Sequence, residues 1–149
     1  ELVVRLKKEF GPMIAGLKDS SGNFSQSASF AEATGGIEKD FDVYPSSEAF
    51  YFMGIEKGCA GIISGSTNVF AKLVQAAIKA PDGPDSKEFE RVVQARSFIG
   101  AFNLMAAMKS AEAKRILDED WERIAPPLRQ LKPDEKLKLY SGLLEFFAN

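Results

Sequence analysis

The chain has 149 residues, of which 45% are hydrophobic and 27% charged, and its formal net charge is −2. This composition is typical of one ordered globular domain and argues against disordered and fibrous proteins. The sequence has no dense run of basic residues and no apolar stretch near the ~20 residues of a membrane-spanning helix, so we expect neither a nucleic-acid nor a membrane partner.

Two residue types narrow the possible chemistry. The sequence contains no histidine, which excludes Ser-His-Asp catalysis, Cys-His catalysis and histidine-ligated metal sites within this chain. Cys59 is the only cysteine, so no internal disulfide can form, and we expect a reducing, cytoplasmic location. Lysine, tyrosine, serine, threonine and the carboxylates remain as candidate catalytic groups.

The first residues have the pattern of an amphipathic helix without its beginning. Residues 2–10 show helical spacing, but no methionine and no capping residue precede them, and no charged-then-apolar leader occurs. We therefore expect no signal peptide, and we expect the 149 residues to be a fragment of a longer protein.

Three short apolar runs predict strands. They cover residues 13–17, 41–44 and 60–63, and small polar residues follow each of them directly. Runs without polar alternation favour strands of a parallel sheet that is covered on both faces. Helical segments at 24–34, 48–57 and 69–79 alternate with these strands, which indicates βαβ units.

The alternation stops in the second half of the chain. The sequence predicts a helical run from residue 86 to about 108, an irregular connector around Pro126 and Pro127, and a last helix that starts at Pro133. Three parallel strands alone would leave both sheet edges open. We therefore predict an α/β fold: residues 1–81 form strands 6–8 and their helices of a partial (β/α)8 TIM barrel, and residues 82–149 form a carboxyl-terminal helical extension. About five further βα units, of roughly 30 residues each, would complete the barrel.

Lys18 is the sharpest candidate for catalysis. It directly follows Leu17 at the carboxyl end of the first strand, where active sites of parallel α/β folds form. An amine held near an apolar interior is more often neutral and can attack a carbonyl to form a Schiff base. The alternative is a lysine that extends to solvent at the end of a strand. Beside it, one of Asp19, Ser20 and Ser21 is expected to cap the helix that begins near Phe24.

The other two strand ends carry candidate binding residues. Ser46, Ser47 and Glu48 follow the second strand and either face a substrate hydroxyl or carboxylate, or cap the next helix. The glycines around the third strand allow a ligand to approach the backbone closely, but they match no phosphate-binding loop. Cys59 is expected to be a small buried hydrophobe.

Two segments resemble one enzyme family. Residues 14–23, IAGLKDSSGN, resemble the Schiff-base lysine motif of the dihydrodipicolinate synthase / N-acetylneuraminate lyase family, and residues 58–68, GCAGIISGSTN, resemble its second signature at the eighth barrel strand. The order and spacing of the two motifs also fit. The resemblance covers the whole chain, but only the carboxyl-terminal half of the family.

The resemblance implies class I aldolase chemistry in a TIM barrel. Lys18 would condense with the ketone of pyruvate or another 2-oxo acid, without a metal or organic cofactor, and the backbone around Ile63 would lie close to the bound group. The family's catalytic tyrosine and its carboxylate-binding motif have no counterpart here and are expected in the missing amino-terminal half of the barrel. The fragment alone is therefore expected to be inactive. The family also implies a homo-oligomer, either a tetramer or a dimer.

Alternatives to a synthase-like lyase remain. Ser46 stands where synthase members carry a glycine, and residues 121–131 resemble the tail of sugar-acid members, so a 2-oxo-3-deoxy sugar-acid aldolase or dehydratase is one alternative. Another is a non-catalytic barrel that binds a 2-oxo acid. A third is a half-barrel that pairs with another chain.

Overall fold

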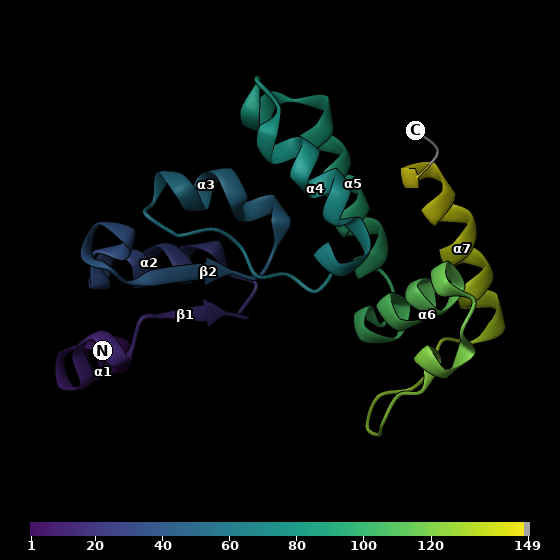
Figure 1. Cartoon of the computed structure of the whole chain (residues 1–149), viewed down its shortest axis with the longest axis horizontal. Helices are drawn as coiled ribbons and strands as arrows, with labels where there is room; N and C mark the ends of the chain where they lie inside the picture. The colour runs from purple at the N-terminus through teal and green to yellow at the C-terminus, as the bar shows by residue number, and fades with distance from the viewer. Residues whose placement is uncertain (148–149) are drawn as a thin grey trace. The chain divides into compact units, whose positions relative to one another are not determined.

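The computed structural model describes residues 1–147, which fall into two compact units, Glu1–Ser64 and a second that begins at Gly65 (Figure 1). The predicted boundary after residue 81 divides a partial barrel from a helical extension. The division into two compact units does not test that boundary, which stays a prediction.

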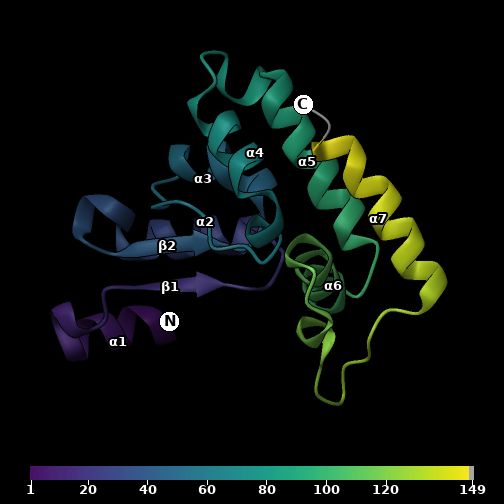
Figure 2. The same cartoon turned by 45° about the vertical axis from the view of Figure 1, so that its right-hand side comes forward.

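The first unit contains a two-stranded parallel sheet (Figures 1 and 2). Its helices and strands, in chain order, are α1 (Leu2–Phe10), β1 (Gly16–Asp19), α2 (Phe24–Thr34), β2 (Asp42–Pro45) and α3 (Tyr51–Glu56). The predicted strand–helix–strand–helix order is present, although β1 begins three residues later than predicted, because residues 11–13 form a short 3-10 turn. Gly35 caps the carboxyl end of α2, and its φ of 81° supplies the left-handed conformation that stops a helix.

The core of this unit lies on one face of the sheet. Ala31 of α2 packs with Phe41, Val43 and Cys59, all of them buried, and burial raises the pKa of the Cys59 thiol. The prediction of a buried, apolar role for this cysteine is confirmed. Successive strand residues point to opposite faces, so the neighbours of Val43 in β2 point away from this core.

The third predicted strand, residues 60–63, is wrong as a strand, although the segment runs beside β2. The Ala60 N–H donates to the Val43 carbonyl at 3.0 Å, and the Ile63 N–H donates to the Pro45 carbonyl at 3.1 Å. The reason lies in Pro45. The Asp42 N–H donates to the carbonyl of Ala15, the residue just before β1, so the nitrogens of residues 43 and 45 point to the opposite side of β2, and Pro45 has no N–H to donate there. The ladder is therefore interrupted where it would otherwise continue.

The second unit is helical. Its α-helices are α4 (Thr67–Lys79), α5 (Lys87–Gly100), α6 (Leu104–Ile116) and α7 (Pro133–Phe147). The predicted continuous helix from 86 to about 108 is wrong, since one helix ends at Gly100 and another begins at Leu104. Asn103 causes the new start, because its side chain accepts a hydrogen bond from the Ala106 N–H at 3.3 Å and caps α6.

The predicted irregular connector lies between α6 and α7, and α7 begins at Pro133 as expected. A 3-10 turn at Glu119–Glu122 interrupts the connector, and Glu122 ties it to both helices by accepting hydrogen bonds from Ser110 and Tyr140. None of the helices described in residues 1–147 is long and apolar enough to cross a membrane.

Candidate active site

Lys18 lies on the open face of the sheet. In the parallel register of β1 and β2 it pairs with Tyr44, so the two side chains share the face opposite the core. Lys18 is exposed, and its Nζ donates a hydrogen bond to Ser20 Oγ at 3.0 Å. The amine is thus available to a small molecule and at the same time held at one point.

The turn after Lys18 is organised around Asp19. This residue is 6% exposed, and its carboxylate accepts hydrogen bonds from the Ser21 N–H at 2.9 Å, from Ser21 Oγ at 3.0 Å and from Ser27 Oγ at 2.6 Å. Burial by itself raises the pKa of Asp19, but the hydrogen bonds from Ser27 and Ser21 outweigh it and hold the pKa below its ordinary value. Asp19 is therefore a buried carboxylate that anchors β1 to α2.

The predicted helix cap in this turn is wrong. The residue that caps α2 is Asn23, whose Oδ1 accepts a hydrogen bond from the Ser25 N–H at 3.1 Å. Asp19 instead bonds to Ser21 and to Ser27 of α2, and Ser20 accepts from Lys18. Ser21 Oγ also accepts from the Asn23 N–H at 3.1 Å. Their hydrogen bonds orient the segment that follows the lysine.

The three residues predicted after β2 differ in exposure. Ser46 and Ser47 are half-buried, whereas Glu48 is only 2% exposed and lies in a short 3-10 helix, residues 48–50. Glu48 Oε2 accepts a hydrogen bond from Ser64 Oγ at 2.9 Å, so it connects the turn after β2 with the end of the third segment.

Ile63 stands in that third segment and is 46% exposed. Its N–H donates to the Pro45 carbonyl, so Ile63 lies beside the end of β2. Gly61, two residues earlier, has a φ of 154°, and a Cβ there would lie 3.7 Å from the Tyr44 ring. That distance is an ordinary van der Waals contact, so the positive φ, and not the space beside Tyr44, favours glycine here.

Sequence reasoning missed a second polar pair on the face of Lys18. The Tyr44 hydroxyl donates to the Asp42 carboxylate at 3.0 Å, and this hydrogen bond raises the pKa of Tyr44, so the phenol stays protonated. The signal was present in the sequence, because residues 42 and 44 of a strand share one face. That Lys18 lies on the same face follows from the register of β1 against β2, which the sequence alone does not give.

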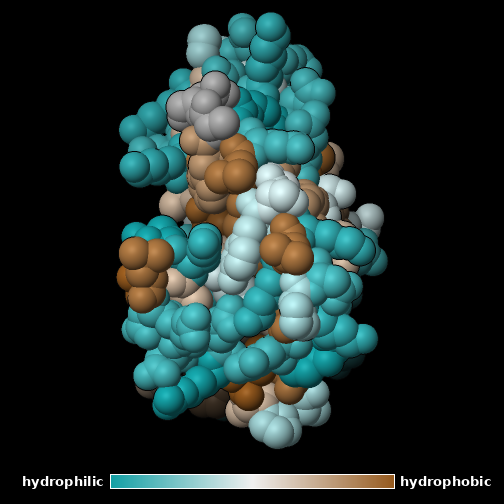
Figure 3. Space-filling view, turned by 90° about the vertical axis from the view of Figure 1, so that its right-hand side faces the viewer, coloured by the Kyte–Doolittle hydropathy of each residue, from teal (hydrophilic) through white to brown (hydrophobic). Residues whose placement is uncertain are grey.

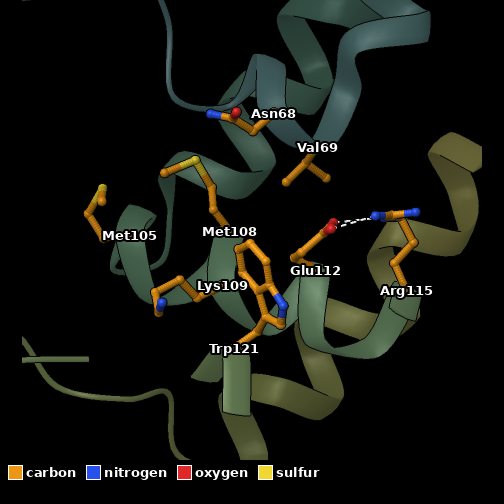
Figure 4. Close-up of a pocket in the computed structure, with 8 residues that line it drawn as sticks. All are labelled: Asn68, Val69, Met105, Met108, Lys109, Glu112, Arg115 and Trp121. Carbon is orange, nitrogen blue, oxygen red and sulfur yellow. Dashed lines mark hydrogen bonds and ion pairs between the residues drawn. The ribbon is translucent and has the colours of Figure 1, made fainter. Parts of the chain in front are cut away.

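The second unit has a separate cavity of about 380 Å³ (Figure 4). Met105, Met108 and Trp121 give it apolar walls, and Lys109 Nζ lies 5.7 Å from the centre of the Trp121 ring. Arg115 at its rim donates to Glu112 at 2.7 Å. None of the sequence-predicted site residues lines it. In residues 1–147, no group of three or more histidine, cysteine, aspartate or glutamate side chains could hold a metal ion.

The surface of the second unit mixes polar and apolar side chains. In Figure 3, hydrophobic residues form separate patches among hydrophilic ones on the face that is turned to the viewer. Leu137 and Leu144 of α7 are among the exposed large hydrophobic residues, at 71% and 69%. Neither residue belongs to the candidate site around Lys18.

Comparison with known proteins gives structural matches alone. No family model and no curated protein matches the chain. Among solved structures, dihydrodipicolinate synthase from Agrobacterium tumefaciens str. C58 is 27% identical, with a TM-score of 0.73 over 99% of this chain and 48% of that one. The chain matches the dihydrodipicolinate synthase family in structure.

Two structures of lower sequence identity have the same fold. Dihydrodipicolinate synthase from Aquifex aeolicus is 19% identical, with a TM-score of 0.76 over 97% of this chain and 48% of that one. YagE, a prophage protein of the dihydrodipicolinic acid synthase family from E. coli K12 in complex with pyruvate, is 21% identical, with a TM-score of 0.74 over 97% of this chain and 50% of that one. The chain thus spans about half the length of the dihydrodipicolinate synthases that it matches.

Proposed function

We propose that the protein is a Schiff-base-forming lyase or aldolase that acts on pyruvate or another 2-oxo acid, with Lys18 as its nucleophile. The observation that carries this proposal is the position of Lys18: an exposed amine near the carboxyl end of β1, on the open face of a sheet that matches half of a dihydrodipicolinate synthase. The pyruvate bound to YagE supports pyruvate as the first oxo acid to test.

The chemistry needs one amine and no metal or organic cofactor. The neutral Nζ of Lys18 attacks the ketone carbon, and a proton moves from nitrogen to the former carbonyl oxygen to give a carbinolamine. A further proton, taken from solvent water or a neighbouring acid, lets that oxygen leave as water and gives an iminium that keeps one N–H. When a carbon–carbon bond at the neighbouring carbon breaks, the iminium accepts its electron pair and becomes an enamine. When such a bond forms, a proton first leaves that carbon to give the enamine, whose electron pair then attacks the acceptor carbonyl. Hydrolysis of the iminium restores the lysine and releases the product.

The same proposal assigns the binding residues. The hydroxyls of Ser46 and Ser47, half-buried after β2, face the oxo acid, and the backbone at Ile63 lies along it. Glu48, which is buried, contributes by holding Ser64 and therefore the end of the third segment. The remaining half of the barrel closes the site in the full-length protein, which we propose to be a cytoplasmic homo-oligomer, either a dimer or a tetramer.

The test is borohydride trapping on the full-length protein with pyruvate, followed by peptide mass mapping. We expect a reduced pyruvyl adduct on Lys18 that disappears in Lys18→Ala and persists in Lys8→Ala, which removes an exposed lysine of α1. A folded protein that gives no Lys18 adduct with pyruvate or with a series of longer 2-oxo acids would overturn the proposal. Adduct formation that is much faster with 2-oxo-3-deoxy sugar acids than with pyruvate would identify a sugar-acid aldolase or dehydratase.

A further inference from the structure

Ser20 is the residue that fixes the end of the Lys18 side chain. Its Oγ accepts a hydrogen bond from Lys18 Nζ at 3.0 Å, and both side chains are exposed. A lysine side chain has four rotatable carbon–carbon bonds and loses about 2 kcal/mol of rotamer entropy when it is held in one place. The hydrogen bond to Ser20 offsets part of this loss and gives the end of the side chain one preferred place.

The acceptor itself is held firmly. On one side of Ser20, the buried carboxylate of Asp19 binds Ser27 Oγ of α2 at 2.6 Å. On the other side, Ser21 is bound twice by the same carboxylate, through its N–H and its hydroxyl, and also accepts from the Asn23 N–H. Ser20 is thus an exposed hydroxyl between two anchored neighbours, and its backbone has little freedom to move away from Lys18.

We propose that Ser20 is a positioning residue for the Schiff-base lysine, an inference that rests on the proposed function. With one N–H of the neutral amine donated to Ser20 Oγ, the lone pair of Nζ is restricted to the directions that remain, and a ketone approaching from there meets it in an attacking geometry. After water has left, the iminium keeps one N–H. That N–H can stay on Ser20 Oγ as a charge-assisted hydrogen bond, which is stronger than the neutral one.

The first test compares Ser20→Ala with Ser20→Thr in the full-length protein. A hydrogen bond of ordinary strength corresponds to about a twofold to tenfold change in rate. We expect Ser20→Ala to lower the rate of pyruvate adduct formation at saturating pyruvate by about that factor, with KM changed less than about twofold. The Ser20→Thr variant keeps a hydroxyl oxygen at this position and restores the rate. Ser29→Ala, which removes an exposed hydroxyl from the middle of α2, is the matched control and leaves the rate unchanged.

The second test separates this inference from the proposed function. Reductive methylation with formaldehyde needs an attacking amine but no 2-oxo acid, and mass mapping gives the labelling of Lys18 relative to Lys8. We expect this ratio to fall by about twofold to tenfold in Ser20→Ala and to be preserved in Ser20→Thr. If the wild-type protein forms no adduct with pyruvate or with any of the longer 2-oxo acids, the proposed function fails and the methylation ratio still decides the role of Ser20. If Ser20→Ala equals wild type in the methylation ratio, the positioning role is overturned, whether or not the Schiff-base function stands.

Discussion

A buried carboxylate holds the turn that follows β1, since Asp19 accepts three hydrogen bonds from Ser21 and Ser27. These bonds favour the ionised form and lower its pKa in the folded protein despite burial. A carboxylate with a lowered pKa stabilises the fold at any pH above its unfolded value of about 3.9, and this stabilisation is lost as the pH falls through the folded value.

We predict that Asp19→Asn lowers the free energy of unfolding by about 1–3 kcal/mol at pH 7, because hydrogen bonds to an ionised group are lost. The difference from wild type should begin to shrink as the pH falls below the unfolded value of about 3.9, and it should go on shrinking as the pH falls toward the lowered pKa of the folded protein. Urea unfolding of both proteins across this range measures it. A difference that stays constant down to pH 2 would show that the charge of Asp19 contributes nothing.

Gly16 of β1 lies beside the backbone of Asp42 in β2. A Cβ at this position would overlap the backbone carbonyl oxygen of Asp42, its register partner, and backbone atoms cannot yield as a flexible side chain does. We predict that Gly16→Ala destabilises the protein by about 1–3 kcal/mol, as overpacking usually does. Gly54→Ala is the control, because its Cβ would meet the Cys59 Cβ at an ordinary 3.4 Å. Equal melting temperatures for the two variants would contradict the prediction.

At the scale of elements, side-chain hydrogen bonds hold an irregular connector in place. The connector between α6 and α7 is fixed by Glu122, which accepts from Ser110 Oγ and the Tyr140 hydroxyl, each at 3.2 Å, and forms an ion pair with Lys136. Burial raises the pKa of Glu122, but the bonds from Lys136, Ser110 and Tyr140 outweigh it and lower the pKa. The carboxylate therefore stays ionised and joins a helix on each side of the connector.

We predict that Glu122→Ala lowers the free energy of unfolding by about 2–3 kcal/mol, because three partly buried donors lose their acceptor. Glu119→Ala, in the same 3-10 turn but exposed, is expected to cost less than about 0.5 kcal/mol. Chemical denaturation measures both. Similar losses in the two variants would mean that the hydrogen bonds of Glu122 do not hold the connector.

The differences between predicted and observed elements have particular physical causes. Apolar periodicity continues across residues 101–103, so it predicts one helix, while the cap that divides it depends on a single side chain, Asn103. The third strand failed for a different reason. The nitrogen of Pro45 points either toward β1 or toward residues 60–63, depending on the register of β1 against β2. A single sequence does not reveal that register.

In the candidate site, too, some features could be predicted from the sequence and others could not. The place of Lys18 at the end of a strand followed from the apolar run before it, because active sites of parallel sheets form there. Its hydrogen bond to Ser20 did not follow, since that contact depends on the turn that Asp19 organises from α2. Residue types and strand ends were predictable, whereas contacts that depend on turn geometry were not.

At the scale of the whole molecule, the sheet is short for the fold that it matches. Among the described residues β1 has one hydrogen-bonded neighbour, β2, and the face with Lys18 leaves that side chain exposed. The matched structures are about twice as long as this chain. A Schiff-base reaction needs groups around the amine that bind the carboxylate, exclude water and move protons, and one exposed face supplies few of them.

We therefore predict that the purified 149-residue chain does not turn over pyruvate, whereas the full-length protein does. The measurement is pyruvate consumption in the presence of a series of aldehydes, with Lys18→Ala full-length protein as the background. Slow trapping of pyruvate on Lys18 of the 149-residue chain is compatible with this prediction, because a free amine forms an imine without a closed site. Steady turnover at a rate near that of the full-length protein is not, and it would mean that these residues alone complete the catalytic machinery.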